Sequence, residues 1–255
     1  MSLRGEGWYA DPQDEYRLRW WDGAAWTENT LALADDRPDL PRWWRGVSVA
    51  LQIALLGCLL AAAFTLYVDF EILGFVDDVR LRPDTVVEAD GERIDRLIAL
   101  SSAEIVATLV AGILFISWLY TAHHSARMDR AALRHGSGWA IGGWFVPVLN
   151  LWRPFQMVTD VRRGATGDRD VDVPRTQGWW WGTLLASYVL SLVSGELYDR
   201  AARIPDVEPD RYLDAFASAA TWERYTCAFT ILSAILAIVV VREIHALVRA
   251  ERTDA

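Results

Sequence analysis

The residue types best suited to metal or covalent chemistry are few: His123, His124, His135, His245, Cys58 and Cys227. The first two histidines are adjacent, so on a helix they point to different faces and make a poor metal pair by themselves. The other two can join them only through the fold, and both cysteines lie inside apolar runs, as small buried thiols usually do. No nucleophile motif, phosphate loop or dinucleotide fingerprint is present. We therefore expect no catalytic residue, no metal, no cofactor and no enzymatic activity.

Charge and composition narrow the class of partner. The net charge is −9, and no basic stripe offers itself to phosphates, so we expect no nucleic-acid partner. Hydrophobic residues make up 53% of the 255 residues and cluster in long blocks, which predicts membrane lipids as partners. Two stretches, Asp69–Leu97 and Tyr198–Thr221, are acidic; we interpret them as solvated outer loops, and a cation or partner site there stays open.

Any site must be positioned by helices that cross the bilayer. A crossing helix needs about 20 apolar residues, and four stretches qualify or nearly qualify: about 46–68, 98–122, 179–197 and 222–241. Aromatic residues stand near their ends, where interfacial anchors belong, among them Trp43, Trp44, Trp118, Trp179, Trp180 and Trp181. No signal-peptide pattern precedes the first run, so we expect it to insert and remain. The sequence thus predicts a mostly α fold with a four-helix transmembrane domain over residues 46–250.

A fifth apolar segment, Gly138–Pro154, is short and is interrupted by Pro147 and Pro154, which each remove a helix hydrogen bond. With four spans, 17 arginines lie on the inner side and 7 in the outer loops, whereas a fifth crossing makes the two sides nearly equal. The positive-inside rule therefore favours four spans in the cytoplasmic membrane, with both termini cytoplasmic. Residues 138–160 are then interfacial or re-entrant.

Small or hydroxyl side chains recur at helical spacing in each span, including Ser187 in the third and Thr230 in the fourth. Such stripes let helices approach closely, and their hydroxyls can bond across the contact. A polar solute pathway would use the same residues but usually adds an intramembrane charge, and no carboxylate or arginine lies near the middle of a span. Helix packing is the favoured interpretation.

The N-terminal residues 1–30 predict a Trp-rich β-hairpin module. Tyr16–Trp21 alternates as a strand does, and Trp26 begins the return strand. Asp22-Gly23 is a strong two-residue turn signal, because such a turn needs a positive φ at both central residues, and we expect Gly23 to adopt one. So few residues cannot bury an ordinary core, so tryptophans must supply one. Residues 31–45 follow as a linker.

This module resembles a short actinobacterial family, domain of unknown function 2510. The resemblance rests on residues whose spacing is retained: Trp8, Tyr9, Asp11, Pro12, Trp20, Asp22, Gly23 and Trp26. Ala10 stands where a proline is usual, which loosens the leading turn. The family has no assigned activity. Exposed aromatics on such a module suggest peptide or protein binding, and tryptophans consumed by the small core are the other interpretation.

Residues 50–250 resemble the actinobacterial membrane family called domain of unknown function 4328. The resemblance rests on Trp118, on Gly138-Trp139-Ala140, on Trp144-Phe145-Val146-Pro147 and on Asn150-Leu151-Trp152-Arg153-Pro154, with Gln156 and Val241-Arg242-Glu243-Ile244 beside them. The family usually has arginine and asparagine after the second span, whereas His123, His124, Ser125 and Arg127 stand here.

The central motif makes physical sense as an interfacial brace. Its tryptophans can sit at headgroup depth, its first proline bends the segment, and its asparagine can satisfy backbone groups freed at the bend. Arg153 can reach lipid phosphate or a helix C-terminus. A structural elbow and a binding site both remain open for these residues: Trp139, Trp144, Pro147, Asn150, Trp152, Arg153 and Pro154.

These features predict a non-enzymatic membrane protein that acts as a scaffold or sensor, with a cytoplasmic module that recruits a protein partner. The alternative is a transporter or channel component that uses the acidic loops and the hydroxyl stripes. Solute uptake by proteoliposomes, abolished by bulky substitutions at Ser187 or Thr230, would favour that alternative. The partner and the oligomeric state stay open.

Overall fold

The computed structural model describes residues 5–12, 14–32, 42–205 and 207–249, which separate into an N-terminal unit within residues 1–40 and a second unit, Pro41–Arg249. Of the predicted linker, Leu31 and Ala32 belong to the last strand and Arg42–Arg45 to the first helix. The rest of it, residues 33–41, lies outside the described residues.

The N-terminal unit is a three-stranded antiparallel sheet in the order β1 (Gly7–Asp11), β2 (Asp14–Trp21) and β3 (Trp26–Ala32). The predicted hairpin therefore gains a strand, because β1 pairs with β2 and brings Trp8 opposite Trp20. Trp21 pairs with Trp26, so the connection is the four-residue Asp22–Ala25 and not the predicted two-residue turn. Gly23 has the expected positive φ, at 92°.

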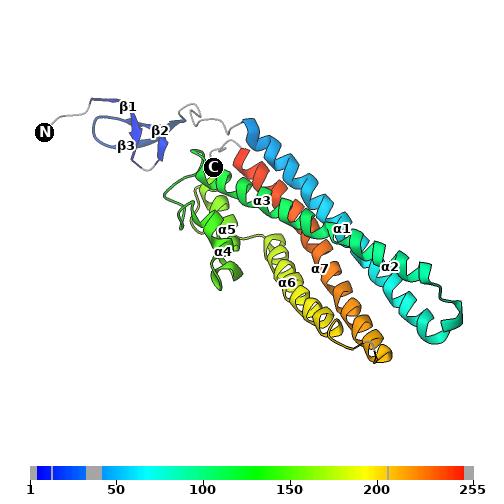
Figure 1. Cartoon of the computed structure of the whole chain (residues 1–255). Coiled ribbons are helices and arrows are strands. Elements are labelled where there is room, and N and C mark those ends of the chain that lie inside the picture. Colours follow the sequence, from blue (N-terminus) through cyan, green and yellow to red (C-terminus); the bar gives the residue numbers. More distant parts are fainter. Residues whose placement is uncertain (1–4, 13, 33–41, 206, 250–255) are drawn as a thin grey trace. The chain divides into compact units, whose positions relative to one another are not determined.

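The second unit is helical. It consists of α1 (Arg42–Leu81), α2 (Glu88–Ser101), α3 (Ala103–His124), α4 (Trp139–Phe145), α5 (Arg153–Thr166), α6 (Arg175–Ala201) and α7 (Pro209–Arg249), with short 3-10 turns at Pro83–Thr85 and Leu149–Leu151. α1 packs against α3 and α7, and α6 packs along α7 as an antiparallel pair (Figure 1). The beginning of α1, the end of α3, α4, α5 and the end of α7 gather at one end. We call this the α5 end.

The long helices run past the predicted ends of the spans. α1 has 40 residues and rises about 60 Å, twice the thickness of the hydrocarbon core. The predicted acidic loop Asp69–Leu97 is therefore mostly helix, and the second half of the predicted loop Tyr198–Thr221 is the beginning of α7. The extension is stable because apolar residues at helical spacing meet there in a small core: Val68, Ile72, Ile94 and Ala220.

By length and composition, three helical stretches of the described chain qualify as membrane spans, and not the predicted four. They are Trp43–Leu81, Glu88–His124 and Pro209–Arg249. α6, which contains the predicted span 179–197, has 27 residues and is long enough. Three tryptophans, a glutamate and recurring serines lower its mean hydropathy below that of a typical span.

The tryptophans predicted at the interface divide into two groups. Trp43 and Trp179 are exposed, whereas Trp44, Trp118, Trp180 and Trp181 are buried inside the bundle. Trp44 stacks on the imidazole of His245 with ring centroids 4.7 Å apart, and it lies 6.2 Å from Trp118. The indole N–H of Trp118 donates to Ser48 Oγ at 3.0 Å. The prediction that tryptophans stand near the helix ends is correct, but Trp44 and Trp118 pack against protein and not at the membrane interface.

The hydroxyls of α6 behave partly as predicted. Thr183, Ser187 and Ser194 are buried and face the bundle, as a packing stripe should. Each donates to a carbonyl of its own helix, at 2.8, 2.9 and 3.2 Å respectively, so the cross-helix bonds predicted for them are not made by these donors.

Candidate functional site

The central motif folds as an elbow, defined here as Gly138–Pro154, between α3 and α5. α4 ends at Phe145, Pro147 lies in the exposed turn that follows, and Leu149–Leu151 forms a 3-10 turn. Pro154 is buried in the first turn of α5, where a missing N–H costs no helix bond. The prediction that it breaks a helix is therefore wrong: it begins one.

The bend itself is made by the backbone. The N–H of Asn150 donates to the carbonyl of Val146 at 3.1 Å, so the predicted closure of the bend involves Asn150 through its main chain. Val148 has φ 70°, a conformation that a β-branched residue rarely adopts. Pattern reasoning missed this residue, because nothing in a valine signals a positive φ.

Arg153 folds back onto the elbow. Its guanidinium lies 4.9 Å from the centre of the Trp139 ring, and its Nη1 donates to Gln156 Oε1 at 3.0 Å. A side chain at Gly143 would place its Cβ 2.6 Å from Arg153 Cγ, so glycine is required for this approach. In the structure Arg153 contacts residues of its own segment, and its reach to lipid phosphate or to a helix C-terminus stays a prediction.

An aromatic cluster holds the elbow against the bundle. The Trp144 ring lies 5.8 Å from Phe115 on α3 and 6.0 Å from Trp181 on α6, in edge-on contacts. The indole N–H of Trp181 donates to the carbonyl of Leu151 at 2.8 Å. Trp139 and Trp152 are each more than a third exposed. Of the three tryptophans predicted at headgroup depth, Trp144 is thus fixed by protein contacts.

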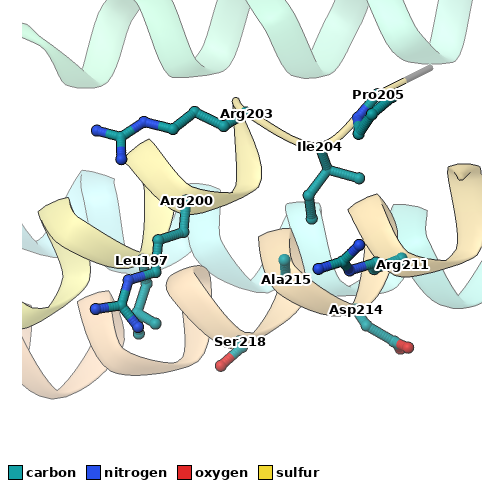
Figure 2. A pocket seen from close by; sticks show the side chains of 9 residues that line it. All are labelled: Leu197, Arg200, Arg203, Ile204, Pro205, Arg211, Asp214, Ala215 and Ser218. Carbon is teal, nitrogen blue, oxygen red and sulfur yellow. The ribbon is translucent and has the colours of Figure 1, made fainter.

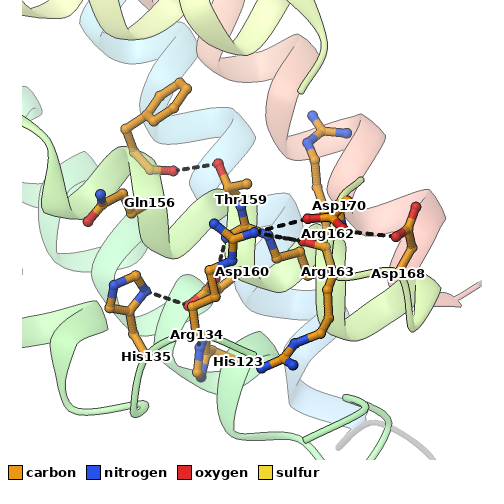
Figure 3. A network of polar contacts seen from close by, with 12 residues as sticks. His123, Arg134, His135, Gln156, Thr159, Asp160, Arg162, Arg163, Asp168 and Asp170 are labelled. Carbon is orange, nitrogen blue, oxygen red and sulfur yellow. Dashed lines mark hydrogen bonds and ion pairs between the residues drawn. The ribbon is translucent and has the colours of Figure 1, made fainter. Parts of the chain in front are cut away.

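Beside the elbow, α5 carries a buried polar network that sequence reasoning missed (Figure 3). The carboxylate of Asp160 is fully buried, 2.7 Å from His135 Nδ1 and 2.8 Å from Arg163 Nη1. His123 Nε2 lies 4.0 Å from the same carboxylate, longer than a hydrogen bond, and its Nδ1 contacts Ser137 Oγ at 3.0 Å. Burial raises the pKa of Asp160, but the contacts with His123, Arg163 and His135 outweigh it and lower the pKa to about 2.

The second half of the network joins three helices through Arg162. This arginine is buried; its Nε donates to Gln177 Oε1 on α6 at 2.8 Å and its Nη2 to Glu243 Oε2 on α7 at 2.7 Å. Gln177 in turn donates to Thr159 Oγ1 at 2.9 Å, and Thr176 donates to Glu243 at 3.2 Å. Of these residues, only Glu243 was named from the sequence, as part of the motif on which the family resemblance rests. Arg162 could have been recognised as an arginine on the apolar side of an amphipathic helix.

Two of the four histidines thus approach one carboxylate, while His124 stacks on Tyr120 and His245 contacts Ser48 Oγ at 3.0 Å. Among the described residues, no group of three or more histidines, cysteines, aspartates and glutamates is arranged to hold a metal ion. The Asp160 cluster is a hydrogen-bonded network that fixes the α3–α4 connection to α5.

A cavity of about 220 Å³ lies toward the other end of the bundle, between α1, α2, α6 and α7. Asp69, Glu223, Tyr198 and Thr65 line it, and Asp69 is almost completely buried. Thr65 also donates to Glu104 Oε2 at 2.6 Å. From its place in the sequence, Asp69 was predicted to be the first residue of a solvated loop. Only the continuation of α1 as a helix turns its carboxylate inward.

A larger hollow, about 620 Å³, is open at the turn between α6 and α7 (Figure 2). Arg200, Arg203 and Arg211 line it together with Asp214. Most of this charge is already matched, because Arg200 pairs with Glu196 at 2.8 Å, Arg211 with Glu208 at 2.9 Å and Asp214 with Arg80 at 2.5 Å. The hollow therefore presents no concentrated positive site.

In the N-terminal unit, aromatics lie on both faces of the sheet. Trp8 and Trp20 make an edge-on contact at 5.4 Å, and the Trp26 ring is 5.2 Å from Trp21 and 6.4 Å from Tyr9. Asp22 Oδ1 accepts the N–H groups of Ala24 and Ala25 at 2.8 and 2.7 Å, which closes the turn and lowers the pKa of its carboxyl. Trp8 stays 41% exposed, so the small core does not consume every ring.

The comparisons with known proteins agree with this two-part organisation. The family model described as Protein of unknown function (DUF2510) matches residues 7–38, and the one described as Domain of unknown function (DUF4328) matches residues 85–246. No curated protein and no solved structure shows a match to this chain. The second model covers more than half of the chain, including the elbow, the α5 network and α6. The chain therefore belongs to the family described as Domain of unknown function (DUF4328).

Proposed function

We propose that this protein is a non-enzymatic, multi-pass protein of the cytoplasmic membrane that acts as a scaffold or sensor. Its helical unit anchors it with four crossings, α1, α2–α3, α6 and α7. Its N-terminal sheet lies in the cytoplasm and recruits a protein partner. The absence of enzymatic activity rests on the sequence, which has no recognised nucleophile, phosphate-binding or dinucleotide motif.

The observation that carries this proposal is the antiparallel pairing of α6 with α7. A helix that lies along a crossing helix for most of its length crosses the same layer. α6 also presents an exposed apolar face that suits lipid, formed by Tyr188, Val189, Leu192 and Val193. A fourth crossing gives an even number, so the beginning of α1 and the end of α7 lie on one side.

The charges support the cytoplasmic assignment of the α5 end. Arg127, Arg130, Arg134, Arg162, Arg163 and Arg169 all belong to the connections and the helix at that end. The extension at the other end carries most of the carboxylates of the two acidic stretches. Recruitment is supported by Trp8, because half-exposed tryptophans are common anchors of protein interfaces.

A proximity-labelling enzyme fused to the N-terminus of the full chain would test the recruitment role. We expect Trp8→Ala to remove a defined set of labelled neighbours while membrane insertion stays unchanged. Leu31→Ala is the matched control, since it also truncates an exposed apolar side chain of the same sheet. Identical labelling by wild type and Trp8→Ala would contradict recruitment through this face.

The second candidate function, a transporter or channel component, is favoured by one observation, the cavity lined by Asp69 and Glu223 within the helical unit. Polar groups between membrane helices usually serve a pathway. Uptake of a cation by proteoliposomes that Asp69→Asn abolishes would support this function. Uptake equal to that of empty vesicles, measured for several cations, would oppose it.

A further inference from the structure

The outer surface of the elbow is apolar and uncharged. From Gly138 to Trp152 the sequence contains no ionisable side chain. Phe145 is 73% exposed and Val148 63%, and Val146, Leu151 and Trp152 are also more than a third exposed. An exposed apolar patch of this kind, continuous along one loop, usually marks a site that contacts another protein, a ligand or a membrane.

The contacts of the elbow set its level along the bundle. Trp144 packs on Phe115, which lies seven residues before Ala122, the end of the predicted second span. At 1.5 Å per residue, that contact is about 10 Å inside the end of the span. On α6, the carbonyl of Leu151 is bonded to Trp181, one turn deeper than Gln177 of the polar network. The elbow therefore reaches past the charged layer toward the middle of the helices.

Charged side chains lie closer to the ends of the helices than the contacts of Trp144 and Leu151. The network of Asp160, Arg162 and Glu243 is formed by α5 and by the terminal turns of α6 and α7. Arg153, the charged residue of the elbow, turns onto Trp139 and Gln156 and so faces protein. A segment that enters one leaflet requires a neutral tip beyond the charged layer. It also needs its backbone groups bonded within the protein, and the N–H groups of Val146, Asn150 and Leu151 all donate to carbonyls of the same segment.

We propose that the elbow is a re-entrant segment, and that its tip, Phe145–Leu151, lies among the acyl chains of the cytoplasmic leaflet. The occupant of the exposed apolar surface is lipid hydrocarbon, which also covers the exposed face of α3 at Ile105, Leu109 and Ile113. This inference rests on the proposed function, since it assumes that α3 crosses the membrane.

Spin labels on the full chain in phospholipid vesicles would test the placement. Cys58 and Cys227 are both buried and are first replaced by alanine. A single cysteine is then introduced by Val148→Cys or Phe145→Cys at the tip. Ile113→Cys serves as the reference for lipid-facing α3 and Asp168→Cys, at an exposed position after α5, as the reference for water. The measured quantity is the ratio of accessibility to oxygen over accessibility to a water-soluble nickel chelate.

We expect both tip labels to show a ratio severalfold higher than Asp168→Cys and close to that of Ile113→Cys. Ratios equal to that of Asp168→Cys would overturn the proposal and place the elbow on the membrane surface. Low accessibility to both reagents would also overturn it, because the tip would then be covered by protein, such as a second copy of the chain. If Ile113→Cys itself behaves like Asp168→Cys, the crossing of α3 is wrong, and the proposed function fails together with the placement.

Discussion

Replacing Arg162 with methionine should be the most destabilising single change at the α5 end. The side chain is buried and joins α5 to α6 through Gln177 and to α7 through Glu243. Methionine fills a similar volume but removes the donor of Gln177 Oε1 and of Glu243 Oε2, and the Glu243 carboxylate keeps only the hydroxyl of Thr176. Truncating one partner of a buried ion pair costs about 3–5 kcal/mol.

The expected loss is smaller than that limit, because the Glu243 side chain is 33% exposed and water partly screens its charge. We expect the free energy of unfolding to fall by about 2–4 kcal/mol. For a chain of this size, each kcal/mol moves the melting temperature by about 2–4 °C, so the shift should be roughly 5–15 °C.

Thermal unfolding in detergent, followed by tryptophan fluorescence at one scan rate, measures this shift. The matched control is Arg211→Met, which breaks an exposed pair with Glu208 and should cost less than about 1 kcal/mol. Combining Arg162→Met with Glu243→Met should recover part of the loss, since no unpaired carboxylate remains. A melting temperature for Arg162→Met as close to wild type as that of the control would refute the reasoning.

Three further predictions concern single positions. Because the folded-state pKa of Asp160, about 2, lies below its usual 3.8, its carboxylate should contribute about 2 kcal/mol above pH 4. That contribution should disappear as the pH falls from about 4 to 2, and Asp160→Asn should flatten the dependence of melting temperature on pH over this window. Gly23→Val should expose the amides of β2 and β3 to hydrogen exchange, since valine at φ 92° costs about 1–3 kcal/mol, whereas Ala24→Val in the same turn should leave exchange unchanged. Val148→Gly should raise the melting temperature by relieving a strain of about 1–3 kcal/mol, and no rise would show that Val148 is unstrained.

The elbow illustrates how far sequence reasoning reached. Pro147 correctly predicted a bend in this segment, and the turn that contains it follows α4. The partners of the segment's residues could not be read from the sequence. A proline is a helix breaker or a helix start depending on which side of it the helix forms, and Pro154 starts α5. Whether the Arg153 side chain extends to lipid phosphate or packs on its own segment depends on whether the Trp139 ring lies within reach, which the sequence does not show.

The sequence alone determined the two-part organisation, the mostly helical class and the approximate places of the three helical stretches long and apolar enough to span a membrane, because hydrophobic blocks and turn residues act over a few neighbouring positions. It also marked Gly23 as a position of positive φ. Tertiary structure alone decided which tryptophans are buried, how far α1 and α7 extend, and that Asp69 lines a cavity. It alone joined Asp160 to His135 and Arg162 to Glu243, 81 positions apart. Such pairings depend on the rotation of one helix against another, which packing of the whole bundle sets and no local pattern contains.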